Sequence, residues 1–152
     1  MDDIDRAILN VLQREARIAN NELAERVGLS PSPCLRRVRA LEASGVIESY
    51  AAILDADKLD CGYSPIVWVT LDAVTRATMT EFEGAVAEID HIVEALRMMG
   101  QPDYLLRIAL ADAAAFEAFY IDVLAGLPHV QKLTSQLAMT TVKRSHTLPI
   151  RT

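Results

Sequence analysis

The spacing of apolar residues changes part-way along the chain, and this change constrains the fold most strongly. In the first third, Ile4, Ile8, Val11 and Leu12 recur every three or four positions, which is typical of amphipathic helices. Further on, the β-branched run Ile66–Leu71 indicates a strand instead. We therefore expect two small domains and a polar, turn-rich hinge: residues 1–54, a hinge over 55–63, and residues 64–152.

Three short helices are predicted in the first domain. Gly28 stands where a helix end often needs a left-handed residue. The third helix is expected to begin near Ser32 or Pro33, because serine is a common helix cap and proline is favoured at the first helical position. Two apolar segments follow that helix, Val46–Ser49 and Tyr50–Leu54, and we expect them to pair as a hairpin. Three helices followed by such a hairpin form a winged helix-turn-helix.

The second domain is expected to alternate strands and helices. Its first strand is followed by an amphipathic helix whose inner face includes Phe82 and Val86. The order β-α-β-β-α-β predicts a ferredoxin-like sandwich, so the whole chain is expected to be an α+β protein. The remaining elements are strands over His91–Met99 and Tyr104–Ala111 around a turn at Gly100–Asp103, a helix capped by Asp112, and a last strand over Val130–Lys143.

The third predicted helix combines an apolar face with an arginine-rich face. Leu35, Val38 and Leu41 have the three-residue spacing of an inner face, and the arginines fall away from it. The arginine side chain can hold a phosphate, or the O6 and N7 atoms of guanine, with two hydrogen bonds. Ser30 and Ser32 lie near the helix N-terminus, which itself favours phosphate. The sequence thus predicts a recognition helix for double-stranded DNA with contacts from Ser30, Ser32, Arg36, Arg37 and Arg39.

The net charge of −6 does not argue against DNA binding, because the distribution of charge matters more than its sum. Residues 30–44 carry three arginines against the single acid Glu42. The alternative is that these arginines only solvate a surface helix. The surrounding helix-turn-helix pattern favours the DNA-binding interpretation.

Four segments of the sequence resemble the Lrp/AsnC family, also called feast/famine regulators. They are Ile4–Leu9, Glu22–Ala24, the run LSPSPCLRRVRALEASGVI over Leu29–Ile47, and GQPDYLL over Gly100–Leu106. The similarity covers nearly the whole chain, and the motifs occur in the order and spacing of the family. It is specific for the family but not for one member.

The resemblance implies a regulator of amino-acid metabolism with a winged helix and an αβ sandwich. Family members dimerise through their C-terminal sheets, and the dimers often assemble into octamers of four dimers. The five DNA contacts predicted above match the family motif. The effector, a small molecule that we expect to be an amino acid, is implied to bind near the Gly100 turn at contacts between dimers, with help from the last strand.

The turn at Gly100 is therefore the candidate effector site. Gly100 permits close approach of the backbone to a ligand, and the Asp103 carboxylate can accept from an α-ammonium group. Exposed backbone N–H groups at the turn can hold an α-carboxylate. The alternative is a plain hairpin turn. The expected effector-binding residues are Gly100, Asp103, Tyr104, Thr134, Ser135 and Gln136.

Two other functional classes are alternatives. Sirohaem decarboxylases resemble this family and would make the chain an enzyme, but they need no basic recognition helix. An architectural protein would bind DNA with little sequence preference and without an effector. We expect no enzyme activity, no metal site and no cofactor beyond the effector.

Composition and the chain start bear on the compartment. No apolar run reaches the roughly 18 residues of a membrane span. The acidic start Met1-Asp2-Asp3 lacks the basic character of a signal peptide, so we expect a cytoplasmic protein without membrane contact. Cys34 and Cys61 are expected to be reduced thiols.

Overall fold

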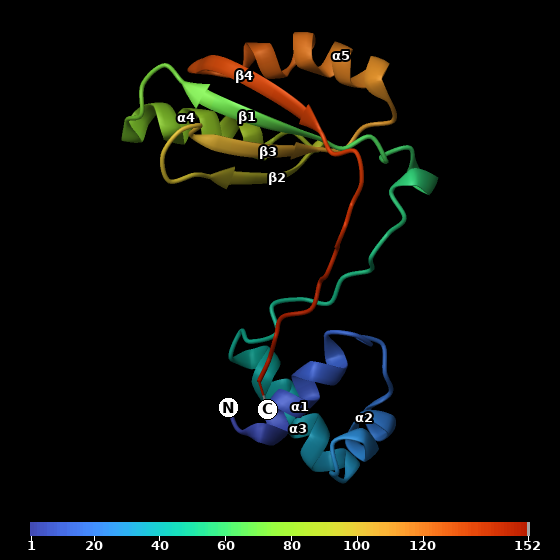
Figure 1. The fold of residues 1–152 in the computed structure, drawn as a ribbon. Helices are drawn as coiled ribbons and strands as arrows, with labels where there is room; N and C mark the ends of the chain where they lie inside the picture. The colour runs from blue at the N-terminus through green and yellow to red at the C-terminus, as the bar shows by residue number, and fades with distance from the viewer. Residues whose placement is uncertain (152) are drawn as a thin grey trace. The chain divides into compact units, whose positions relative to one another are not determined.

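A computed structural model describes residues 1–151. The chain divides into two compact units (Figure 1). The first comprises Met1–Ile53 together with the tail from Val142 onward, and the second comprises Leu54–Thr141. The structure groups this tail with the first unit, whereas the expected boundary had assigned it to the ligand-binding domain.

The tail joins the first unit through hydrogen bonds to its first helix. The Leu148 N–H donates to Gln13 Oε1 at 2.8 Å, and Gln13 Nε2 donates to the Leu148 carbonyl at 3.1 Å. Arg6 Nη1 donates to the Arg151 carbonyl, and Ile150 packs against the core of the unit. These contacts explain why the expected last strand over Val130–Lys143 is too long, because the chain leaves the sheet after Leu137.

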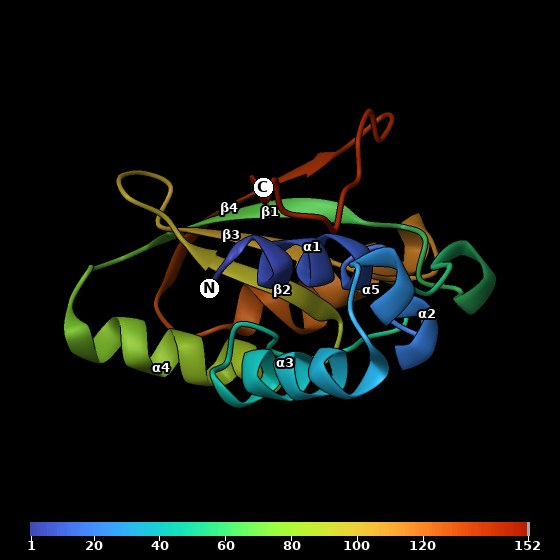
Figure 2. The same ribbon diagram turned by 90° about the horizontal axis from the view of Figure 1, so that it is seen from below.

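The first unit is built from three helices, as predicted. They are α1 (Asp3–Leu12), α2 (Asn20–Arg26) and α3 (Pro31–Ala43). The Asp2 carboxylate caps α1 by accepting from the Asp5 N–H at 2.9 Å, and Asp5 returns the bond to the Asp2 N–H. Figure 2 shows the three helices α1, α2 and α3. They surround a core of Ile8, Leu9, Leu12, Leu23, Ala24, Cys34 and Leu41.

The predicted hairpin over residues 46–54 is not formed, and this prediction was wrong. The segment contains no strand. The N–H groups of Val46 and Ile47 both donate to the Leu41 carbonyl, which closes the end of α3 instead of starting a ladder. The Tyr50 hydroxyl then donates to Glu42 Oε1 at 2.9 Å, and burial together with this acid raises the Tyr50 pKa to about 12. An isolated two-stranded hairpin with its apolar side chains exposed is only marginally stable in water.

The second unit has the predicted β-α-β-β-α-β order. Its strands form one sheet in the order β2-β3-β1-β4, in which all three neighbouring pairs are antiparallel. This is the ferredoxin-like topology. The elements are β1 (Pro65–Leu71), α4 (Arg76–Ala87), β2 (Ile92–Arg97), β3 (Tyr104–Ile108), α5 (Ala113–Asp122) and β4 (Val130–Leu137), with short 3₁₀ helices at Asp57–Leu59 and Leu124–Gly126.

Both helices of this unit cover the same face of the sheet. Phe82 of α4 and Phe119 of α5 pack into one core with Val67, Val69 and Leu106. Strand alternation places Trp68 and other residues between these on the opposite face, which neither α4 nor α5 covers. The second unit therefore exposes one face of its sheet, and this face positions the candidate ligand site.

Residues 1–151 contain neither a membrane-spanning helix nor a cluster of metal-ligating side chains. The longest helix there, α3, has 13 residues, and no helix is long and apolar enough to cross a bilayer. Within the same range, no group of three or more histidine, cysteine or acidic side chains could hold a metal ion. Cys34 and Cys61 are both free thiols.

His129, at the start of β4, makes the stability of the second unit depend on pH. Its Nε2 atom lies 2.8 Å from Glu81 Oε2, and its Nδ1 atom lies 3.7 Å from Asp72 Oδ1. The hydrogen bond with Glu81 raises the His129 pKa most, and the charges of Glu81 and Asp72 add to it. The stabilisation is complete below the ordinary pKa of 6.5 and is lost as pH rises through the higher folded value.

We expect His129→Asn to lower the free energy of unfolding more at about pH 6 than at about pH 9. Asparagine tolerates the positive φ of 61° found at this position, so the backbone is not strained by the change. Urea denaturation at both pH values measures the difference. An equal loss at both would show that the ion pairs contribute nothing.

Candidate DNA interface and effector site

The outer face of α3 is the candidate DNA interface. Successive helical residues turn by about 100°, so Ser32, Arg36 and Arg39 fall within a sector of about 60°. All three side chains are exposed. Neither arginine forms an ion pair within residues 1–151, so both guanidinium groups are available to phosphates or base edges.

The N-terminus of α3 adds a second feature suited to phosphate. Ser30 is the N-cap residue, but its hydroxyl makes no capping hydrogen bond, and Pro31 occupies the first turn. The Asn20 amide donates to the Pro31 carbonyl at 2.9 Å, which ties the start of α2 to the start of α3. The free hydroxyl and the first N–H groups of the helix together favour an anion.

Arg37 does not share the outer face with the other two arginines. Its Nη1 atom donates to Asp2 Oδ2 at 2.8 Å and to Asp5 Oδ1 at 2.7 Å. These acids raise the Arg37 pKa, and the Asp2 pKa is lowered, first by the Asp5 N–H and then by Arg37. The predicted DNA contact Arg37 thus holds the recognition helix against the start of α1.

Leu35 lies outside the inner face to which the sequence analysis assigned it. Its side chain is 38% exposed, whereas Cys34 is fully buried and takes the inner position. Leu35 therefore borders the sector of Ser32 and Arg39. Thymine methyl groups are read by such apolar contacts, so Leu35 is a candidate that sequence reasoning missed.

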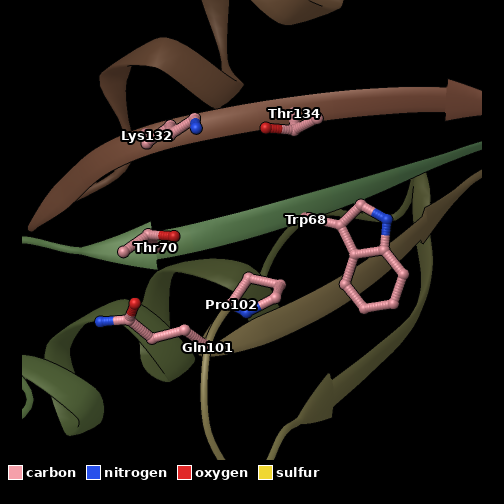
Figure 3. Close-up of a pocket in the computed structure, with 6 residues that line it drawn as sticks. All are labelled: Trp68, Thr70, Gln101, Pro102, Lys132 and Thr134. Carbon is pink, nitrogen blue, oxygen red and sulfur yellow. The ribbon is translucent and has the colours of Figure 1, made fainter.

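A pocket of about 380 Å³ lies on the uncovered face of the second unit. Figure 3 shows its lining: side chains of β1 and β4 on one wall and the loop before β3 on the other. The indole N–H of Trp68 donates to Gln136 Oε1 at 2.9 Å, which orients the ring. The lining residues are Trp68, Thr70, Gln101, Pro102, Lys132 and Thr134.

The structure brings part of the predicted effector set to this pocket. Thr134 lines it, and Gln136 is on the same face and holds Trp68. Gly100 lies in the adjoining loop with a φ of 101°, a conformation that favours glycine. Ser135 pairs with Val67, whose side chain faces the helices, so Ser135 lies on the opposite face from Thr134.

Asp103 has a structural role: it holds the loop that forms one wall of the pocket. Its side chain is only 9% exposed, and Oδ2 accepts from the buried Leu71 N–H at 2.8 Å. Its own N–H donates to the Val69 carbonyl, and its carbonyl accepts from the Met98 N–H. Asp103 thus ties the loop before β3 to the end of β1.

We expect Asp103→Ala to destabilise the second unit by about 1–3 kcal/mol, because it leaves the buried Leu71 N–H without an acceptor. Asp103→Asn retains an oxygen in place and is the matched control. Urea denaturation of both variants measures the effect. Equal stability of the alanine variant and the parent chain would contradict this role.

Tyr104 points away from the pocket. Its ring is 2% exposed and packs on Phe82 with centroids 4.6 Å apart, on the helix side of the sheet. Its hydroxyl donates to Glu83 Oε1 at 2.7 Å. Burial and the neighbouring Glu83 raise the Tyr104 pKa. The predicted effector residues are therefore divided between the two faces of the sheet.

Trp68, Thr70 and Lys132 were missed by sequence reasoning as pocket residues. Trp68 pairs with Thr134 and Thr70 pairs with Lys132, so all four share one face. The alternation of β1 indicates that face, because Val67, Val69 and Leu71 are buried. The pairing with β4 is a long-range property, and no local pattern in the sequence reveals it.

The fold and these surfaces define the class of DNA-binding regulators that carry a separate ligand-binding domain. Residues 1–48 match the family model for winged helix-turn-helix DNA-binding, and residues 64–148 match the model for the Lrp/AsnC ligand binding domain. The chain belongs to the Lrp/AsnC family and is a ligand-controlled transcription regulator. The predicted fold class and family are thereby confirmed.

Similar proteins of known function or structure are also transcription regulators of this family. The leucine-responsive regulatory protein of Escherichia coli (strain K12) is 40% identical over 152 residues, which cover 100% of this chain and 93% of the relative. A transcriptional regulator from Neisseria meningitidis, solved in complex with L-Met, matches with a TM-score of 0.93 and 34% identity over 98% of this chain and 96% of its own. An AsnC family regulator from Agrobacterium tumefaciens matches with a TM-score of 0.92 and 36% identity over 98% and 97%.

Proposed function

We propose that this regulator binds double-stranded DNA through the outer face of α3 and that a free amino acid controls it from the pocket beside Trp68. The observation that carries the proposal is the combination of an unpaired cationic face on α3 with a pocket that offers one ammonium group and an aromatic wall. The chain acts in the cytoplasm on genes of amino-acid metabolism.

On DNA, Arg36 and Arg39 contact base edges or phosphates, while Ser30 and Ser32 position the helix N-terminus against the backbone. Leu35 contacts a thymine methyl group. Arg37 does not contact DNA; it fixes α3 against α1 through its hydrogen bonds to Asp2 and Asp5. These roles supply positioning and direct readout from one helix, as in other helix-turn-helix proteins.

In the pocket, the Lys132 ammonium holds the α-carboxylate of the amino acid. Thr70 and Thr134 provide hydroxyl partners, and the indole of Trp68 contacts the ligand side chain. Gly100 allows the loop backbone to approach the ligand. The regulator solved with L-Met supports an amino acid as the class of effector.

The uncovered sheet face is proposed to form a dimer with a second copy, and dimers to form octamers. Ile66, Trp68 and Leu105 lie on this face half-buried, and Leu96 is 46% exposed. Effector binding in the pocket on this face alters assembly, and assembly sets which DNA sites are engaged together.

We expect Leu105→Glu to convert the protein to monomers at micromolar concentration, since a charge in the centre of an apolar interface is buried without a partner. The matched control is Ile121→Glu, which places the same charge on an exposed position of α5. Sedimentation velocity of the two variants measures the outcome. A leucine variant that sediments like the parent chain would exclude this face as the interface.

The proposal as a whole is tested by sedimentation velocity of the full chain, alone and with each of the twenty amino acids. A change in sedimentation with at least one amino acid is expected. A single species whose sedimentation is unchanged by all twenty amino acids would contradict the proposal and indicate an effector of another chemical class.

A further inference from the structure

A second cavity, of about 450 Å³, lies between α4 and the edge strand β2. It is on the helix side of the sheet, so the sheet itself separates it from the pocket beside Trp68. No role proposed above uses it. Its lining residues are Phe82, Glu83, Val86, Ala87, Ala95, Arg97 and Tyr104.

The floor of this cavity is apolar and preformed. Phe82 is fully buried, Val86 is 6% exposed, and the Tyr104 ring packs on Phe82. Ala87 on α4 and Ala95 on β2 have short side chains, which leave the space between helix and strand unfilled. The volume falls in the range of about 300–1,000 Å³ that small-molecule sites occupy.

The rim of the cavity carries one acid and one base side by side. Arg97 donates through Nε, at 2.8 Å, and through Nη2 to Glu83 Oε1, which also accepts from the Tyr104 hydroxyl at 2.7 Å. The hydrogen bond from Arg97 lowers the Glu83 pKa most, and the hydrogen bond from Tyr104 lowers it further. The carboxylate is therefore charged at neutral pH. Within residues 1–151, Glu83 Oε2 and Arg97 Nη1 make no hydrogen bond.

Glu83 Oε2 and the two N–H groups of Arg97 Nη1 are therefore free, on two charged groups that are in direct contact above an apolar floor. A free α-amino acid presents the complementary pair, an ammonium and a carboxylate on neighbouring atoms, with a side chain between them. An amine alone or a carboxylate alone would use only half of the rim.

We propose that the cavity between α4 and β2 is a second amino-acid site, with the ligand ammonium on Glu83, its carboxylate on Arg97 and an apolar side chain against Phe82 and Val86. A second site would extend the control by amino acids that we propose for the pocket beside Trp68. The regulatory role of the second site rests on that proposed function, but its ability to bind an amino acid does not. The ligand chemistry follows from the cavity itself.

Equilibrium dialysis of the full chain against radiolabelled leucine, isoleucine, valine, methionine and phenylalanine counts the equivalents bound. The fluorescence of Trp68, the only tryptophan, reports the first pocket alone. We expect two equivalents per chain for at least one of these amino acids, of which one is silent in fluorescence. Glu83→Gln should weaken the silent equivalent by about tenfold or more, because a charged hydrogen-bond partner is lost.

Ala87→Phe blocks the cavity from an exposed helical position and should abolish the silent equivalent. Ala114→Phe, on an exposed position of α5, is the matched control and should retain it. N-acetyl-leucine and leucinamide, which each lack one charge, should compete at least about tenfold more weakly than leucine.

The outcomes separate this inference from the proposed function. A fluorescence response with a single bound equivalent would overturn the second site and leave the first. A silent equivalent that persists in Ala87→Phe would also overturn it. Both sites would be established if Lys132→Met removes the bound equivalent that changes Trp68 fluorescence and Ala87→Phe removes the equivalent that does not.

Discussion

Replacing Arg36 and Arg39 together with alanine should abolish specific DNA binding while the fold stays intact. Both side chains are exposed on one sector of α3 and form no ion pair within residues 1–151, so their removal breaks nothing inside the first unit. A bidentate contact to a base edge is worth about 1–3 kcal/mol. Loss of two such contacts should weaken binding by about 100-fold or more.

Fluorescence anisotropy measures this with a duplex selected from random sequence by the parent protein, at one fixed salt concentration. Arg76→Ala is the matched control, because it removes the same charge from an exposed position of the second unit. Arg37→Ala should behave differently: it should lower the stability of the first unit, since Asp2 and Asp5 lose their partner. Full affinity in the double variant would exclude the outer face of α3 as the interface.

Replacing Lys132 with methionine should remove the response to amino acids while DNA binding without effector is unchanged. The change keeps the apolar stem and deletes the ammonium that holds the ligand carboxylate. A hydrogen bond between charged groups contributes about 1.5–3 kcal/mol, so the affinity for the amino acid should fall by about 10- to 150-fold.

Isothermal titration of the parent and variant chains with the effector measures this loss. Lys143→Met, outside the pocket, removes the same charge and should bind normally. An undiminished affinity of the Lys132 variant would show that the carboxylate is held elsewhere, for instance by the N–H groups of the loop around Gly100.

The fold could be predicted largely because its signals are local. The spacing of Ile4, Ile8 and Leu12, the β-branched run that became β1, and the turn at Gly100 each act within a few residues. The errors arose where distant partners decide the structure. The tail packs on Gln13 instead of extending β4, and the 46–54 segment folds back on Glu42 and Leu41 instead of pairing with itself.

The candidate site was predicted in outline but not in detail. Residues three apart on a helix are offset by about 60°, so Leu35, Val38 and Leu41 span about 120°. The core lies on the side of Cys34 and Leu41, which leaves Leu35 at the edge. Arg37 is indistinguishable from its neighbours in sequence until the acids of α1 are placed beside it. Trp68 and Lys132 become neighbours only through the pairing of β1 with β4, which joins segments more than sixty residues apart.

The central claim is that an amino acid binds beside Trp68 and thereby controls the regulator, and Trp68 fluorescence tests it most directly. The full chain is titrated with each of the twenty amino acids, in the absence and in the presence of DNA. We expect a saturable change with at least one amino acid, which is absent in Lys132→Met and retained in Lys143→Met. No change with any of the twenty, or a change that is identical in Lys132→Met, would contradict it.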